Sequence, residues 1–143
     1  MSSEMLYSEI FEAFVKAPDK AAKIDVLRRN YDDRFLNFLE CAFNPGIIFD
    51  VEIPEYRPAI EPAGLNFTYL DLEMGKMYRF VVGHPNRPTE LTSEKQQKLL
   101  LVVLESLHKD EAALLVNLLK KDLGIPSLTK KLVSEAFPNL DLG

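Results

Sequence analysis

Prolines divide this chain into two helical regions and a segment between them that cannot be helical. Four of the nine prolines fall between residues 44 and 66, at positions 45, 54, 58 and 62. Proline removes a backbone donor and clashes with the preceding helical turn, so prolines this dense exclude a continuous helix. The apolar run at 47–53 predicts a short extended piece that could form one edge strand. Because the segment is too apolar for a flexible linker, we expect it to lie across the helical body, anchored by Ile48, Phe49 and Tyr56.

On both sides of this segment, apolar residues recur at the spacing of an amphipathic helix. Leu6, Ile10 and Phe14 mark the first helix, which Ser2 or Ser3 can cap. The sequence predicts about seven helices, over residues 3–16, 18–29, 32–43, 69–82, 92–107, 110–122 and 128–136. Thr92 is the predicted cap of the helix that ends at 107, and Ser127 is the predicted cap of the helix over 128–136. Arg28 lies in the last turn of the helix over 18–29, where a cation offsets the negative helix end. A chain of 143 residues is long enough for one core, so we expect a single all-α domain over residues 1–143.

The composition excludes several classes of protein. Apolar residues make up 47% of the chain and charged residues 27%, as in an ordinary soluble globular protein. No run of about 18 apolar residues is present, so we expect no membrane span. The single cysteine, Cys41, excludes an intramolecular disulfide and indicates a reducing compartment, which predicts a cytoplasmic location.

Motifs that carry chemistry are missing from the sequence. Neither His84 nor His108 has a Cys or His at metal-ligand spacing, and no glycine-rich phosphate loop occurs. Cys41 has no evident base partner, and the pairs Asp32-Asp33 and Asp110-Glu111 fall at predicted helix starts, where carboxylates satisfy free N–H groups. We therefore expect a protein that is not an enzyme, with no catalytic residues, metal, cofactor or small-molecule substrate.

Basic side chains form two clusters in a chain whose net charge is −5. Residues 1–66 hold seven Lys and Arg against twelve Asp and Glu, and residues 67–143 hold ten of each. An acidic chain is poorly suited to wrap DNA non-specifically, but a local basic face could contact its backbone. The candidate nucleic-acid-binding residues are Lys120, Lys121, Ser127, Lys130 and Lys131, around a turn before the last helix, and Arg28, Arg29 and Arg34. Alternatively, these lysines are solvated helix ends.

Three stretches carry a resemblance to known proteins. Ala21–Asn30, Asp33–Pro45 and Lys121–Pro138 resemble, in this order, the N-terminal DNA-binding domain of ATP-dependent DNA ligases. The end of the chain, Leu128–Pro138, is more similar to an uncharacterised small-protein family of tailed phages of the T-even type. The ligase resemblance implies a helical domain that grips the minor-groove side of a nicked duplex. The nearest string to the ligase Lys-x-Asp-Gly motif, Lys120–Gly124, has Leu123 before its glycine, so no ligation chemistry is implied.

Three hypotheses of function follow. In the first, a non-catalytic phage accessory protein associates with duplex DNA through the basic helix-turn-helix corner. In the second, an acidic interaction module binds a host or phage replication or transcription protein, presenting Phe49, Tyr56 and Ile60 from the proline-rich segment. In the third, the protein is a small enzyme or a virion component. A positive strip joining Arg28, Arg34, Lys121 and Lys130 would favour DNA, and a broken strip would favour a protein partner.

Overall fold

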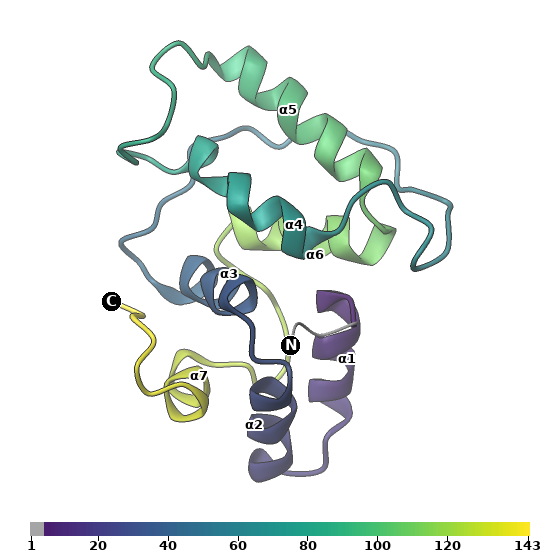
Figure 1. Cartoon of the computed structure of the whole chain (residues 1–143), viewed down its shortest axis with the longest axis vertical. Helices are drawn as coiled ribbons and strands as arrows, with labels where there is room; N and C mark the ends of the chain where they lie inside the picture. The colour runs from purple at the N-terminus through teal and green to yellow at the C-terminus, as the bar shows by residue number, and fades with distance from the viewer. Residues whose placement is uncertain (1–4) are drawn as a thin grey trace.

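The computed structural model describes residues 5–143, and in this range it is all-α (Figure 1). Its elements are the seven α-helices α1 (Tyr7–Lys16), α2 (Lys20–Arg29), α3 (Asp33–Phe43), α4 (Leu70–Glu73), α5 (Ser93–Ser106), α6 (Lys109–Leu119) and α7 (Lys130–Ala136), and the 3₁₀-helix η1 (Met74–Phe80). The predicted fold class is confirmed. The α1, α2 and α7 helices gather at one end of the molecule, α5 lies at the other, and α3, α4 and α6 lie between them.

An aromatic cluster joins the first and third helices in the core. The ring of Tyr7 meets the rings of Phe35 and Phe38 edge-on, at centroid distances of 5.3 and 5.2 Å. Phe11 lies 5.8 Å from the same two rings. All four side chains are buried. Edge-to-face packing adds about 0.5–1.5 kcal/mol per pair beyond area burial, so this cluster fixes how α1 and α3 meet.

Helix starts follow local capping chemistry, with two corrections. Asp19, Asp32 and Thr92 cap α2, α3 and α5 by accepting a backbone N–H two or three residues later. The caps predicted at Ser2 and Ser3 lie outside the described residues, and α1 begins only at Tyr7. The last helix was predicted to start at Leu128 behind a Ser127 cap. It starts at Lys130, capped by Thr129, because Ser127 has a left-handed φ of 67°.

The helix predicted over 69–82 is wrong beyond its first turn. A single α-helical turn, α4, passes into η1, in which three residues complete one turn. Spacing by three places Met74, Met77 and Phe80 on one side, and all three are buried in the core. At the end of η1, Val81 forms an isolated antiparallel bridge with Phe49. This single bridge replaces the edge strand considered for 47–53, and the described residues contain no sheet.

The proline-rich segment lies along α5, as expected for a chain packed across the helical body. Glu52 accepts a hydrogen bond from Gln97 at 3.1 Å, and Glu105 accepts one from the Arg57 N–H at 2.8 Å. Of the three expected anchors, Phe49 and Tyr56 pack against the core. Ile48 does not, since 56% of it is exposed. Ile48 contributes through its backbone instead, because its carbonyl accepts a hydrogen bond from the Val82 N–H beside the bridge at 2.8 Å.

Candidate functional site

One residue of the predicted basic corner, Lys121, turns inward. Its ammonium group donates to the carbonyl oxygens of Cys41 and Asn44, the latter at 2.8 Å, at the end of α3. It also lies 5.9 Å from the centroid of the Phe49 ring. Partial burial lowers the pKa of this lysine. Lys121 is thus a cap on the carboxyl end of α3, where free carbonyls and the helix dipole favour a cation.

Arg28 has the same role at another helix end. Its Nε donates to the Ala136 carbonyl at 2.9 Å and a terminal nitrogen donates to the Glu135 carbonyl at 3.1 Å, both at the end of α7. The sequence had suggested that Arg28 offsets the negative end of its own helix. The guanidinium instead binds the carboxyl end of α7, at a residue 108 positions further along the chain.

Lys23, which the sequence did not single out, completes a set of three such caps. Its ammonium group donates to the carbonyls of Phe14, Val15 and Ala17, at 3.0, 3.2 and 2.9 Å, where α1 ends. Three cations therefore hold three helix ends through carbonyl groups. Nothing local distinguishes such a lysine from a solvated one, because its acceptors belong to another helix.

The other two arginines of the predicted site form ion pairs. Arg29 lies 2.9 Å from Asp25, one turn earlier on α2, and both side chains are largely exposed. Arg34 lies 3.9 Å from Asp71 on α4. The positive strip that would join Arg28, Arg34, Lys121 and Lys130 is therefore interrupted. Lys120, Ser127, Lys130 and Lys131 remain exposed at the surface.

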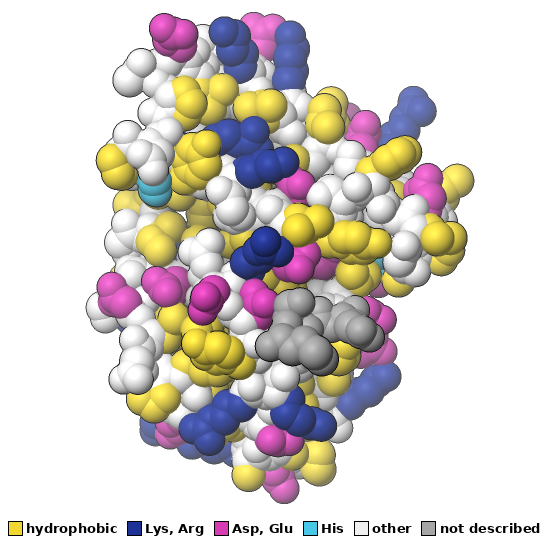
Figure 2. Space-filling view, in the orientation of Figure 1, with side chains coloured by type: hydrophobic (Ala, Val, Ile, Leu, Met, Phe, Trp, Pro, Cys, Tyr) yellow, Lys and Arg dark blue, Asp and Glu magenta, His cyan; other side chains and the backbone are white. Residues whose placement is uncertain are grey.

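A cleft between α2 and α7 contains two of the predicted nucleic-acid-binding residues, Ser127 and Lys131. It has a volume of about 320 Å³ and is lined by Lys20, Lys23, Ser127, Thr129, Lys131, Leu132 and Glu135. Glu135 lies 2.5 Å from Lys20, and this hydrogen-bonded contact lowers the pKa of the carboxyl group. Lys20 is a member that the sequence missed, because its neighbourhood is formed by a helix more than a hundred residues away. Several Lys and Arg side chains are visible at this end of the molecule in Figure 2.

A second feature is a loop that projects from the side of the helical body, residues 57–68 (Figures 1 and 2). We call it the apolar loop, because Ile60, Leu65 and Phe67 are 94, 70 and 90% exposed. Its two ends are held side by side at the end of α5, where Arg57 N–H donates to Glu105 at 2.8 Å and Thr68 N–H donates to the Ser106 carbonyl at 3.2 Å. Compact surface loops with adjacent ends are frequently functional.

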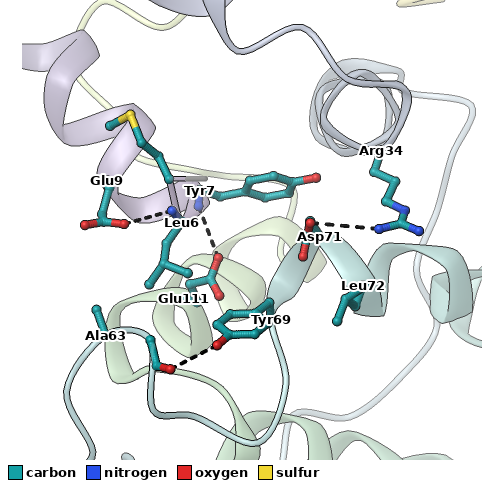
Figure 3. Close-up of a pocket in the computed structure, with 11 residues that line it drawn as sticks. Leu6, Tyr7, Glu9, Arg34, Ala63, Tyr69, Asp71, Leu72 and Glu111 are labelled. Carbon is teal, nitrogen blue, oxygen red and sulfur yellow. Dashed lines mark hydrogen bonds and ion pairs between the residues drawn. The ribbon is translucent and has the colours of Figure 1, made fainter. Parts of the chain in front are cut away.

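A pocket of about 570 Å³ lies beside this loop (Figure 3). We call it the loop pocket, and it is lined by Met5, Leu6, Tyr7, Glu9, Arg34, Ala63, Gly64, Tyr69, Asp71, Leu72 and Glu111. The loop supplies Ala63 and Gly64, and the Tyr69 hydroxyl fixes this wall by donating to the Gly64 carbonyl at 3.1 Å. The remaining walls come from α1, α3, α4 and α6.

Glu111 forms the floor of the loop pocket and is only 1% exposed. One carboxylate oxygen accepts the Leu70 N–H at 3.0 Å and the other accepts the Tyr7 N–H at 3.1 Å. The sequence placed Glu111 at its own helix start; it satisfies instead the first N–H groups of α1 and α4. Burial raises the pKa of this carboxyl group, and the two hydrogen bonds oppose that rise in part.

The cysteine is buried in the core, and both histidines accept hydrogen bonds from nearby backbone N–H groups. Cys41 is buried, and this burial raises the pKa of its thiol to about 11. His108 caps α6 by accepting the Asp110 N–H at 3.2 Å, and His84 accepts the Asn86 N–H at 3.0 Å. Within residues 5–143, no group of three or more His, Cys, Asp or Glu could hold a metal ion.

Over the same range, the structure contains no helix with the length and apolar character needed to cross a membrane.

By its fold, the chain is an all-α protein with one core and a proline-rich segment packed along it. More particularly, it belongs to DUF6433, a family of unknown function whose model matches residues 10–125. No curated protein and no solved structure shows significant similarity to the chain.

Proposed function

We propose that this protein is a non-enzymatic interaction module that binds a partner protein through its apolar loop. The observation that carries the proposal is the exposure of Ile60, Leu65 and Phe67 on a loop held at both ends. Burying a large apolar side chain is worth about 1.5–3 kcal/mol, so three of them supply a substantial driving force for association. Since the ends of the loop are fixed, less conformational freedom is lost on binding.

The proposal revises which residues meet the partner. The sequence suggested Phe49, Tyr56 and Ile60, but Phe49 and Tyr56 pack against the core of this chain. Ile60 remains, and Leu65 and Phe67 join it. The interrupted basic strip also favours a protein partner over DNA, since Lys121 and Arg28 already bind backbone carbonyls. The similarity of Leu128–Pro138 to T-even-type phage proteins supports a phage or host replication or transcription protein as the partner, in the cytoplasm of the host cell.

Photo-crosslinking in a lysate of infected host cells tests the proposal. The loop variant carries Ile60→Ser, Leu65→Ser and Phe67→Ser. The matched control changes three exposed apolar residues elsewhere, Val15→Ser, Ile48→Ser and Val82→Ser.

We expect one protein to be crosslinked by the wild type and the control and lost with the loop variant. The purified partner should then bind the wild type in calorimetry, with at least about tenfold weaker binding to the loop variant. Equal capture by both variants, or no specific capture by the wild type, would refute the proposal.

A second candidate function is nucleic-acid association, which the cleft between α2 and α7 favours. Lys131 of this cleft, with the exposed Lys130 beside it, offers a local basic surface on an otherwise acidic chain. The resemblance to ligase DNA-binding domains supports the same candidate. In a gel shift at low salt on duplex and nicked DNA, Lys130→Glu with Lys131→Glu should abolish binding. The matched pair Lys95→Glu with Lys98→Glu, on α5, should leave binding unchanged.

A further inference from the structure

We infer that the loop pocket receives a cationic side chain, arginine or lysine, from the partner segment that covers the apolar loop. The inference rests on the proposed function and names the chemistry of the partner. The two features share one wall, because Ala63 and Gly64 line the pocket while Ile60 and Leu65 stand on either side of them in the sequence. A segment that covers the apolar loop therefore lies at the mouth of the pocket.

The charges around the pocket favour a cation. Among the described residues, three carboxylates line it, Glu9, Asp71 and Glu111, against one cation, Arg34. Glu111 is fully engaged by two backbone N–H groups, and Glu9 accepts the Leu6 N–H at 2.8 Å. Glu9 and Glu111 therefore make the electrostatic potential in the pocket more negative, and Asp71 is the carboxylate that can bind a ligand directly.

Asp71 is only weakly engaged in this structure. Its nearest partner is Arg34, at 3.9 Å, whereas a charge-assisted hydrogen bond between a cationic nitrogen and a carboxylate is about 2.7–2.9 Å long. Its side chain is part-exposed, with 36% of its surface accessible. An incoming guanidinium or ammonium group can thus bind Asp71 more closely than Arg34 does.

A second, independent observation is the hydroxyl group of Tyr7. Tyr7 is 4% exposed, and its oxygen has no hydrogen-bond partner among the described residues. Figure 3 shows the ring reaching across the pocket wall, with the hydroxyl end on the side of Asp71 and Arg34. Burial and the negative charge of Asp71 raise the pKa of this phenol, which therefore stays protonated. Because the oxygen is itself buried, a cationic group that pairs with Asp71 can donate a hydrogen bond to it only once the side chains at this wall shift.

The shape of the pocket suits a long basic side chain. Its volume of about 570 Å³ falls in the range of sites for small ligands. Leu6, Tyr69 and Leu72 supply apolar and aromatic surface along its walls. Lysine and arginine pack their aliphatic stems on such surface while their charged ends reach polar groups. The partner segment should therefore combine apolar residues, for the loop, with a nearby arginine or lysine.

A displayed library of random 16-residue peptides, selected on the full chain, tests this inference. We expect enriched peptides that pair apolar residues with arginine or lysine and that do not bind the loop variant. Replacing the basic residue by its neutral counterpart, citrulline or norleucine, should weaken binding to the wild type by about tenfold. On the Asp71→Asn variant, the same replacement should have little effect.

Two further variants separate a binding role from a structural one. Tyr7→Phe removes only the unpaired hydroxyl, so it should weaken binding of the basic peptide without lowering the stability of the fold. Asp122→Asn, an exposed change away from the pocket, should leave binding unchanged.

Enriched peptides without a basic residue, still lost with the loop variant, would overturn this inference and leave the proposed function standing. Equal weakening on wild type and Asp71→Asn would also overturn it. So would a dimer in sedimentation that the loop variant abolishes, since a second copy would then cover the loop. Failure of the lysate experiment, by contrast, would remove the proposed function itself.

Discussion

Replacing Glu111 by alanine should destabilise the fold far more than any exposed carboxylate change. The carboxylate accepts the N–H groups that begin α1 and α4, at 3.1 and 3.0 Å, and it lies on α6. Its removal leaves two buried donors without an acceptor. Each unsatisfied donor costs about 1–3 kcal/mol, so the free energy of unfolding should fall by about 2–6 kcal/mol. Relief of the buried charge brings the expected value toward the lower half of this range.

Glu111→Gln should have an intermediate effect. Its carbonyl oxygen can accept one of the two N–H groups, but its NH₂ group faces the other. Asp110→Asn is the matched control, since Asp110 is exposed on the same helical turn, and it should change stability by under about 1 kcal/mol. Urea unfolding followed by circular dichroism at 222 nm measures all three variants.

The pH dependence gives an independent check. Burial raises the pKa of Glu111 in the folded state, so the folded protein binds the proton more tightly than the unfolded chain does. The contribution of this group to stability is therefore fully present below its ordinary pKa of 4.5 and is lost as pH rises through the raised value. The free energy of unfolding of the wild type should exceed that of Glu111→Gln most at low pH, and this difference should shrink as pH rises. A cost for Glu111→Ala no larger than that of Asp110→Asn would refute the reasoning.

Two other predictions follow from buried groups. Lys121→Ala should lower the free energy of unfolding by about 1.5–3 kcal/mol, because a charged donor to two carbonyls is lost, while the exposed neighbour Lys120→Ala should change it by under about 0.5 kcal/mol. Equal costs in urea titrations would contradict the capping role of Lys121. The thiol of Cys41 has a pKa of about 11 in the native protein and an ordinary pKa of 9.0 in the unfolded chain. Because the thiolate is the reactive form, at pH 8 the native protein should react with a disulfide reagent at least about a hundredfold more slowly than the urea-unfolded protein. Comparable rates in the two states would show that Cys41 is not buried in this way.

Local patterns predicted most of the helices and failed where distant groups decide. Thr92 caps α5 as expected, since its acceptor and the Lys95 N–H are three residues apart. The 69–82 segment has the apolar content of one helix, but the bridge to Phe49 and the burial of Met77 and Phe80 favour the tighter turn of η1. Ser127 is a good capping residue by type, and only its left-handed backbone excludes it from that role.

The candidate sites were harder to predict than the helices. Lys121 and Lys130 look alike in the sequence, since both are lysines at a helix end. One binds the end of α3 and the other is exposed, because the fold brings Cys41 and Asn44 to Lys121 alone. Of the residues that the sequence suggested for partner binding, only Ile60 lies in the apolar loop. Leu65 and Phe67 have the composition of core residues, and only the projecting course of the loop leaves them exposed.

The sequence by itself determined the helical class, the position of the proline-rich segment and most helix caps, because these depend on side chains within about four residues of one another. Tertiary structure alone decided which cations hold helix ends, that Glu111 joins three helices, and that an apolar loop stands beside an acidic pocket. These outcomes depend on groups such as Tyr7 and Glu111, which are 104 positions apart. Such pairs share no local pattern, and only the packing of the helices brings them into contact.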